Sequence, residues 1–504
     1  MLRSFYHIFL LRVFIRSFTL ATNSLRGRGN INMEEAQTNS AERIKKQDDK
    51  LKFGEKLSYS FAGAAETFSF AITSTFMVFF YTDFLKIDAG VVGTILFISQ
   101  VLSAVAIIWM GRLFDKKKNS SAKGWIMWLA VPHSIALILA FCVPNFGTVG
   151  KIIYAFVTYN LLITVCYSAI NLAYSILNTR MTSNQLDRSD LSVFRTLAAS
   201  VVTIIVNLLT MKIVAAFGNN ARAWTLTMLI YGVGAALLFT CTYLFTKERI
   251  VQVKDLSEDK PSDDSNVKIV KNTFWKDIKI ASQNKYCILL MVIFALNFAF
   301  QGTQNVYVYY CTYFLKDANV LGLRSLAGVV ILILTLLSLH PLIHKFGKRN
   351  LSLFGSFICL IGYLLVLFNT GSIILSIVAY MITTFGSAPF TGAKFAMVSD
   401  SVEYGEWKTG IRTEGMTFSI VTFGQKIGTG IGAAMTGWLL SFSKYVPQAK
   451  VQSAATMNAI LGMMVWVPVI LCVAQIVLLW RYHLDREYPT ILQELRHRKV
   501  TDSH

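Results

Sequence analysis

The amino-acid sequence predicts an all-α polytopic membrane protein, with about twelve transmembrane helices arranged as two six-helix bundles. Three observations lead to this prediction. Apolar residues make up 54% of the 504 residues and charged residues only 15%, against about 25% charged in soluble proteins. The apolar residues gather in separate runs of about twenty, the length that spans the hydrocarbon core of a bilayer. Similar segments also recur in the two halves of the chain.

The composition excludes several classes of protein. A soluble enzyme could not bury this much apolar surface, and a disordered or disulfide-stapled secreted chain is excluded as well. The seven cysteines are scattered without a CxxC pair, and the seven histidines form no HExxH motif. We therefore predict no metal site and no cofactor. The net charge of +20 suits retention of basic loops on the cytoplasmic side better than a nucleic-acid partner.

The apolar runs give the order of the helices. Helices satisfy their own backbone hydrogen bonds in lipid, and these runs are too long for barrel strands, so a helical bundle follows. We centre the predicted helices near residues 70, 100, 132, 162, 205, 235, 297, 331, 360, 385, 427 and 470.

The basic residues between the helices predict the orientation. Five lie between residues 112 and 123, after the second helix, and three lie between 345 and 349, after the eighth. The alternate loops carry few. The positive-inside rule then places both termini in the cytoplasm of a multi-pass protein of the plasma membrane.

Two halves are indicated by a repeat, because residues 79–86 and 309–316 are alike and lie about 230 residues apart. Transporters place their sites between such repeats. The predicted parts are a cytoplasmic N-terminal segment (1–55), a first bundle (56–246), a cytoplasmic linker (247–285), a second bundle (286–482) and a cytoplasmic tail (483–504). Residues 1–32 are a surface helix, a targeting segment or sequence upstream of a true start at Met33, and we favour the last.

Five polar residues lie within predicted helices, where charge is costly. Glu66 lies in the middle of the first helix. Asn171 is either a site residue or a helix-packing contact, and Arg195 by its position alone extends toward the interface. For Lys426, within a long apolar run, a functional role is favoured. For Lys394, functional and structural roles are equally supported. Lys394 follows a stretch, residues 386–392, that is able to break a helix, and the glycine-rich segment 424–437 permits close helix contact.

One stretch of the sequence is highly specific. Residues 400–415, DSVEYGEWKTGIRTEG, resemble the loop between helices ten and eleven of the glycoside–pentoside–hexuronide:cation symporter family, a branch of the major facilitator superfamily. Residues 56–59, 111–115 and 171–174 are similar to further family motifs, and Arg195 and Lys426 match family positions. The resemblance implies the major facilitator fold and a gating loop with charged residues Asp115, Asp400, Glu403, Glu406, Arg412 and Glu414.

The chain also departs from the family pattern. The two aspartates that hold the coupling cation in melibiose permease correspond to Ser103 and Ile107, and its sugar-binding aspartate corresponds to Thr67, next to Glu66. Its helix-four aspartate corresponds to Asn171. Isoleucine offers no oxygen to sodium, so we expect a proton to be the coupling ion rather than sodium.

The resemblance and the charges together predict a secondary transporter of a sugar, glycoside or uronide that works by alternating access, and not an enzyme. A sodium symporter with a rearranged ion site and a non-transporting receptor or scaffold remain alternatives. The predicted substrate-binding residues are Glu66, Thr67, Asn171, Tyr174, Arg195, Lys394 and Lys426, and the predicted coupling residues are Glu66, Ser103 and Asn171. The partners are the small-molecule substrate, H⁺ or Na⁺, and the lipid bilayer.

Overall fold

The structure of the protein is a computed structural model that describes residues 51–116, 121–182, 185–249, 283–317, 320–410, 414–449 and 451–501. The chain divides into the segment Met1–Leu51 and a second unit, Lys52–His504, and the second unit is described by itself. The segment 1–32 of uncertain origin and most of the predicted linker, residues 250–282, lie outside the described residues.

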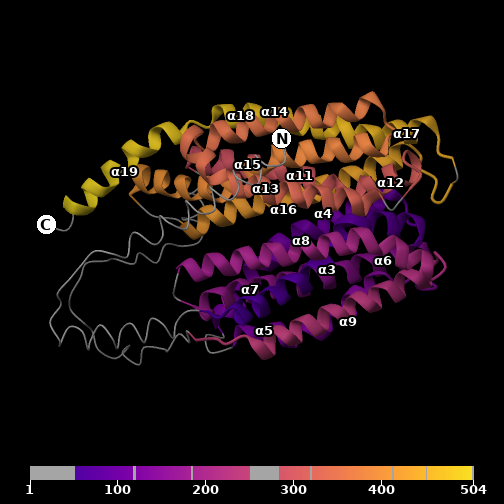
Figure 1. Ribbon diagram of the computed structural model, residues 1–504. Helices are drawn as coiled ribbons and strands as arrows, with labels where there is room; N and C mark the ends of the chain where they lie inside the picture. Colours follow the sequence, from indigo (N-terminus) through magenta and orange to yellow (C-terminus); the bar gives the residue numbers. More distant parts are fainter. Residues whose placement is uncertain are drawn as a thin grey trace, which may run out of the picture. The chain divides into compact units, whose positions relative to one another are not determined.

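The secondary structure within the described ranges is helical, with no strand. Two bundles lie side by side in Figure 1, the first coloured indigo to magenta and the second orange to yellow. The first bundle contains α3 (Phe53–Asp83), α4 (Ala89–Lys116), α5 (Ala122–Ala140), α6 (Thr148–Tyr159), η1 (Asn160–Tyr167), α7 (Ser168–Met181), α8 (Gln185–Ala216) and α9 (Ala221–Phe245). The second contains α11 (Lys285–Gly302), η2 (Thr303–Asn305), α12 (Val306–Tyr313), α13 (Val320–Phe346), α14 (Lys348–Leu365), η3 (Val366–Phe368), α15 (Ile373–Thr409), α16 (Glu414–Phe442), α17 (Ala454–Leu461), η4 (Gly462–Trp466), α18 (Val467–Arg481) and α19 (Leu484–Thr501).

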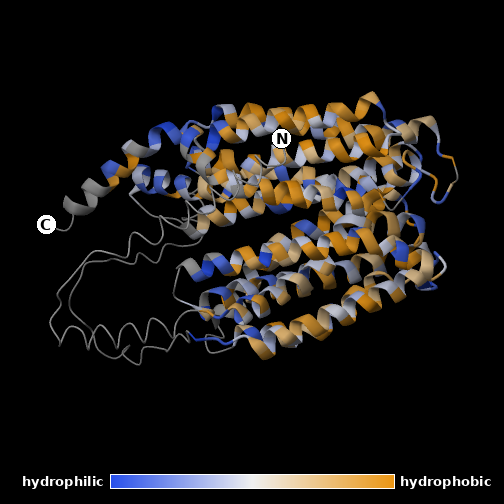
Figure 2. Cartoon of the chain, in the orientation of Figure 1, coloured by the Kyte–Doolittle hydropathy of each residue, from blue (hydrophilic) through white to orange (hydrophobic). Residues whose placement is uncertain are grey.

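Ten segments of the described chain are long and apolar enough to cross a membrane, and α13 carries a shorter apolar helix at Val320–Leu336. With the 29-residue helix α16, the two bundles contain six spanning segments each. Figure 2 shows apolar residues along the helices and hydrophilic residues gathered near their ends. Large apolar side chains such as Phe354 and Ile470, which are 63% and 65% exposed in the chain itself, suit contact with lipid. These features agree with the predicted all-α membrane fold.

The glycine-rich segment of α16 packs closely against α11. A Cβ atom on Gly428 would overlap the carbonyl group of Ala295, and one on Gly432 would overlap that of Ala299. The backbones of the two helices therefore touch directly. In lipid, where helix association gains no hydrophobic free energy, small residues stabilise it by allowing such close contact.

The two bundles meet at one end, which we call the sealed end, where α3 ends and α4 begins. There α4 crosses α16, and Gly93 and Gly437 come so close that a Cβ on Gly437 would meet the Cα of Gly93 at 2.7 Å. Helices α8 and α13 also pack together, with Asn207 Nδ2 donating to Ser325 Oγ over 2.6 Å. The opposite end, where α3 begins and α15 ends, is called the linker end.

Hydrogen bonds between the bundles centre on Asp83, a carboxylate only 1% exposed at the sealed end. It accepts from Tyr445 Oη over 2.9 Å and from the backbone N–H of Gln448 over 3.0 Å. Its neighbour Thr82 bonds Tyr309 Oη over 2.8 Å. Burial, followed by the nearby Tyr309 and Asp83, raises the pKa of Tyr445 far above its ordinary value, so this phenol stays protonated and donates. Residues of both bundles thus close this end.

The linker end is arranged differently, because each ion pair among the described residues joins groups of one bundle. Lys56 pairs with Asp187 over 2.8 Å in the first bundle, and Lys348 pairs with Asp400 over 2.6 Å in the second. The inter-bundle hydrogen bonds within the described ranges lie at the sealed end or at the middle of the seam.

Helix α15 differs from the sequence-based prediction in two respects. It runs without interruption from Ile373 to Thr409, through Pro389, although residues 386–392 were expected to permit a break. The stretch resembling a gating loop is helical as far as Thr409, and it ends at Gly410 with a left-handed φ of 70°. Helix formation continues because α19 packs along this extension, where Trp407 Nε1 donates to Glu494 over 2.6 Å.

Candidate functional site

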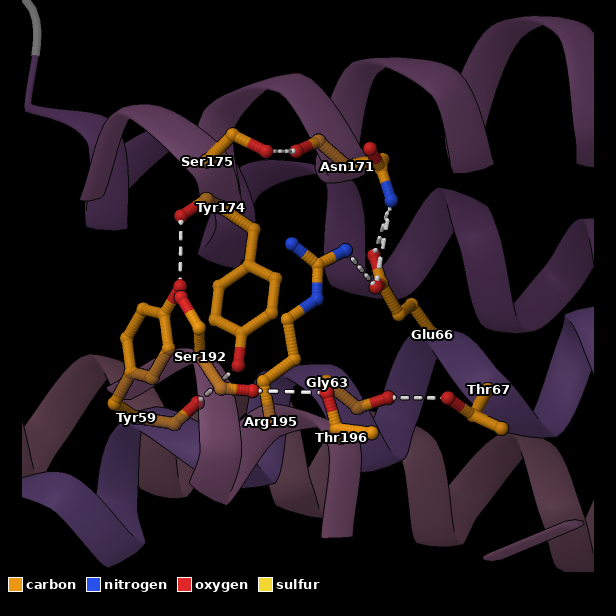
Figure 3. Close-up of polar contacts among 10 residues, drawn as sticks. All are labelled: Tyr59, Gly63, Glu66, Thr67, Asn171, Tyr174, Ser175, Ser192, Arg195 and Thr196. Carbon is orange, nitrogen blue, oxygen red and sulfur yellow. Dashed lines mark hydrogen bonds and ion pairs between the residues drawn. The ribbon is translucent and has the colours of Figure 1, made fainter. Parts of the chain in front are cut away.

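A buried ion pair lies at the centre of the first bundle (Figure 3). Glu66 on α3 is 4% exposed, and its Oε1 lies 2.6 Å from Nη2 of Arg195 on α8. Asn171 on α7 donates from Nδ2 to both carboxylate oxygens, over 3.3 and 3.4 Å. The negative charge of Glu66 is thus matched by one guanidinium and one amide from two other helices.

Aromatic rings hold the guanidinium of Arg195 in place. Its Cζ lies 4.5 Å from the centre of the Tyr174 ring, which stacks on Tyr59 at 4.4 Å. Tyr174 Oη donates to the backbone carbonyl of Tyr59 over 2.9 Å. A Cβ at Gly63 would lie 2.9 Å from Tyr174 Oη, so this glycine leaves the space that the tyrosine needs. The predicted residues Glu66, Asn171, Tyr174 and Arg195 therefore form one cluster.

A cavity of about 170 Å³ lies between the bundles, next to this cluster. It begins one helical turn closer to the sealed end, since Phe70 and Tyr167 line it and lie one turn from Glu66 and Asn171. Its lining residues come from both bundles: Phe70, Thr73, Ser74, Leu96, Gln100, Tyr159, Ile163, Tyr167, Phe298, Gln301, Gly302, Asn305, Gln425, Lys426, Thr429 and Ala433. A water needs about 10–15 Å³ of such space, so the cavity has room for about ten waters or one sugar ring of similar atom count.

Lys426 on α16 supplies the one charged side chain among the residues that line this cavity. Its Nζ donates across the seam to Ser103 Oγ on α4 over 3.2 Å, and Ser103 in turn lies 3.2 Å from Ser168 Oγ. The position that corresponds to a cation-binding aspartate in the family is therefore occupied by a hydroxyl that contacts an ammonium group. Among the described residues no group of three or more metal-binding side chains occurs.

Two amide side chains in the cavity wall have unused acceptors. Gln100 is 8% exposed and Asn305 is 3% exposed, and their oxygens Oε1 and Oδ1 are buried and accept no hydrogen bond from the described part of the protein. A buried acceptor without a partner costs about 1–3 kcal/mol. Because the two oxygens have almost no accessible surface, the hydroxyl groups of a polar ligand would reach them only after the amide groups rotate toward the cavity.

The remaining predicted residues lie elsewhere. Thr67 turns back on its own helix, donating to the Gly63 carbonyl over 2.6 Å. Lys394 on α15 is 7% exposed and lies outside the cavity lining, with its Nζ 4.6 Å from the centre of the Phe298 ring. Its ammonium also faces Phe395 at 5.6 Å. Aromatic faces rather than a carboxylate stabilise this lysine.

The predicted gating residues are only partly described. Asp400 pairs with Lys348, and Glu403 accepts a hydrogen bond from Tyr488 Oη on α19. Glu406 lies on the same extension of α15, and its backbone carbonyl accepts from Gly410 over 2.8 Å. Arg412 and the side chains of Asp115 and Glu414 lie outside the described residues.

Sequence reasoning missed most of the cavity wall. The search of the predicted helices looked for charged side chains. It therefore passed over the neutral polar residues of the wall, which are Gln100, Gln301, Asn305, Gln425 and Thr429. A search for carboxamides within apolar runs would have found them, because such side chains also need partners in lipid.

Comparisons with known proteins agree with this architecture. The model of the family described as "MFS/sugar transport protein" matches residues 58–486. The chain belongs to this family. Its relatives include the isoprimeverose transporter of Lactiplantibacillus pentosus, 31% identical over 90% of this chain and 93% of that protein. The glucuronide carrier protein homolog of Escherichia coli (strain K12) is 27% identical over 88% of this chain and 95% of the other.

Solved structures show the same fold. The nucleoside transporter NupG superposes with a TM-score of 0.57 at 13% identity, over 85% of this chain and 99% of that one. A bacterial homolog of the human lysosomal transporter Spinster, inward-facing and unoccupied, gives a TM-score of 0.61 at 13% identity, over 87% and 97%. The predicted fold and the predicted membership of the glycoside–pentoside–hexuronide branch are confirmed, and this MFS/sugar transport protein is a multi-pass membrane protein from a family of transporters, not of enzymes.

Proposed function

We propose that the protein carries a sugar, a glycoside or a uronide across the plasma membrane by alternating access, and that the cavity between the bundles is its binding site. The observation that carries this proposal is the chemistry of the cavity wall. It combines unused amide acceptors, aromatic rings and one ammonium group. Sugar hydroxyls match the acceptors, and the apolar faces of a sugar ring stack on aromatic side chains.

The location of the cavity supports a transport role. It lies at the seam of two six-helix bundles, where transporters with repeated halves bind their substrates. Two of the relatives are named as an isoprimeverose transporter and as a glucuronide carrier protein homolog. Both names fit a saccharide substrate.

We assign the linker end to the cytoplasm, following the basic residues after the second and eighth helices. Both termini then lie in the cytoplasm. With this orientation the hydrogen bonds around Asp83 close the extracellular end, which is the closure that an inward-facing state requires.

For coupling we propose a proton carried by Glu66 rather than a sodium ion. Sodium prefers several oxygen ligands, ideally with carboxylate charge, yet the described cavity wall holds no carboxylate and places an ammonium beside Ser103. Protonation of Glu66 would release Arg195 and Asn171 from their present contacts. Such a release provides a link between proton binding and movement of α3, α7 and α8.

The test uses purified protein in sealed liposomes and a panel of labelled sugars, glycosides and uronides. We expect saturable uptake of at least one member of the panel, lowered at least tenfold by Lys426→Ala. Uptake of none under any gradient would overturn the proposal. Binding of a labelled sugar without transport or counterflow would instead identify a receptor.

A further inference from the structure

We infer that the cavity takes a sugar with a single negative charge, and that the carrier exchanges such anions across the membrane much faster than it moves them in one direction. This inference rests on the proposed function and deepens it. It starts from the balance of charge along the seam.

Among the described residues, the positive charge of Lys426 has no acidic partner. Each of the six ion pairs in the described part of the chain involves other residues. The carboxylate of Glu66 pairs with Arg195, so this pair is neutral within itself. The hydrogen-bond partner of Lys426 is the hydroxyl of Ser103, which carries no charge. The cavity wall therefore has a net charge of one positive unit.

An acidic sugar fits this wall better than a neutral one. Its carboxylate or sulfonate would pair with the ammonium of Lys426 in a charge-assisted hydrogen bond, which is shorter and stronger than a neutral one. Gln100 and Asn305 in the wall would accept from its hydroxyls after their amide groups rotate, because Oε1 and Oδ1 are buried here. A cation would meet only repulsion.

The same charge controls the transport cycle. Lys426 is half-buried here and reaches across from α16 to α4, so it stands where the bundles must rearrange. When the cavity closes, the ammonium loses water, and an unpaired charge in a low-dielectric interior is strongly disfavoured. A bound anion removes this cost because the pair is neutral. The loaded carrier thus reorients quickly, whereas the empty carrier reorients slowly.

Exchange of one anion for another requires no gradient. One monoanion enters for each one that leaves, so no net charge crosses the membrane. Glu66 keeps Arg195 as its partner in both loaded states and takes up no proton. Net uptake, in contrast, requires the slow return of the empty carrier, so proton coupling at Glu66 drives only that slower mode.

The experiment compares acidic and neutral sugars in the same liposomes. Purified protein is reconstituted without sodium or a pH gradient, and uptake is measured for labelled D-glucuronate, D-galacturonate, D-glucose and D-galactose. We expect uptake of an acidic sugar to be at least tenfold faster into liposomes preloaded with the same unlabelled acid than into empty ones. A potassium diffusion potential set with valinomycin leaves this exchange unchanged.

Variants of Lys426 identify the source of the effect. Lys426→Gln lowers exchange of the acid at least tenfold and removes most of the acceleration by preloading, whereas Lys426→Arg keeps the acceleration. The exposed Lys212→Gln is the matched control and behaves as the parent. Thermal unfolding of each purified variant shows that it is folded.

The outcomes separate this inference from the function on which it rests. Transport of neutral sugars but not of acidic ones would overturn the inference and leave a sugar carrier. Uptake of an acidic sugar with no acceleration by preloading would overturn the exchange mechanism. Acceleration that survives Lys426→Gln would refute the role of this lysine. Transport of no sugar, alone or in exchange, would refute both proposals.

Discussion

Arg195 and Lys426 each bring a positive charge into the interior of the protein, but their surroundings differ. Arg195 contacts a carboxylate, an aromatic face and a tightly packed glycine turn. Lys426 contacts a neutral hydroxyl and the cavity. The first charge is therefore part of a fixed cluster, and the second is available to a ligand.

Glu66→Gln tests the fixed cluster. The amide keeps the shape of the side chain and one acceptor oxygen, but leaves Arg195 without the negative charge that lies 2.6 Å away. Breaking one half of a buried pair costs about 3–5 kcal/mol, and since Arg195 is 28% exposed we expect roughly 3 kcal/mol, measured as a lower thermal unfolding midpoint. Net uptake driven by a pH gradient should fall at least tenfold. Adding Arg195→Gln should recover part of the lost stability, and unchanged uptake in Glu66→Gln would remove the assignment.

Charge was a good guide to part of the site. Because intramembrane charge is costly, Glu66, Arg195 and Lys426 stood out from their apolar neighbours; the first two form the buried pair of the first bundle, and Lys426 lines the cavity at the seam. Lys394 stood out equally, yet its ammonium lies against Phe298 and Phe395. The direction in which a side chain leaves its helix depends on the rotation of that helix in the bundle, which composition does not determine.

Helix α16 combines two tasks that depend on its small residues. Gly428 and Gly432 bring it against α11 inside the second bundle, and Gly437 brings it against α4 of the first. Two residues before Gly428 the same helix presents Lys426 to the cavity. One element thus sets both the packing of its bundle and the position of the ligand-binding charge.

Gly428→Val tests this close packing. The valine side chain would overlap the Ala295 backbone, and overpacking typically costs about 1–3 kcal/mol. The expected result is a lower thermal unfolding midpoint in detergent. Gly234→Val is the matched control, because nothing lies within 4 Å of a Cβ at this helical glycine. Equal unfolding midpoints for the two variants would contradict the close contact.

The helices themselves were easier to predict than their ends. Runs of about twenty apolar residues define the spans because the bilayer sets a length. The extension of α15 to Thr409 was missed because residues 400–409 are polar. Their helical form depends on α19, which is distant in sequence and supplies Tyr488 and Glu494 as partners.

Across the whole molecule, the charge of the cavity predicts the ion requirement. Replacing sodium with potassium in the external medium should leave uptake of the transported sugar unaffected, because the described cavity wall offers no carboxylate to a sodium ion. Initial rates in the two media at equal pH provide the measurement. A strict sodium requirement would favour a rearranged sodium site instead.

The sealed end predicts how the two states can be shifted. Asp83→Asn removes the charged acceptor for Tyr445 and Gln448, so the state open at the sealed end, which is outward-facing in the proposed orientation, should become more populated. The measurement is the rate at which a membrane-impermeant thiol reagent, added outside, labels Gln301→Cys in the cavity wall. We expect at least a severalfold increase over the same chain with Asp83 intact. An unchanged rate would show that Asp83 does not hold this end closed.

The contrast between the ends has a further consequence. The seal around Asp83 consists of buried hydrogen bonds between one carboxylate and neutral groups, whereas the opposite end holds ion pairs whose side chains are 6% to 55% exposed. Dissolved salt screens interactions between exposed charges, with a Debye length of about 10 Å at 0.1 M. It has little effect on buried contacts. Rising salinity should therefore weaken any ionic contact that closes the linker end, and the resting carrier should spend more of its time open at that end in brine than in fresh water.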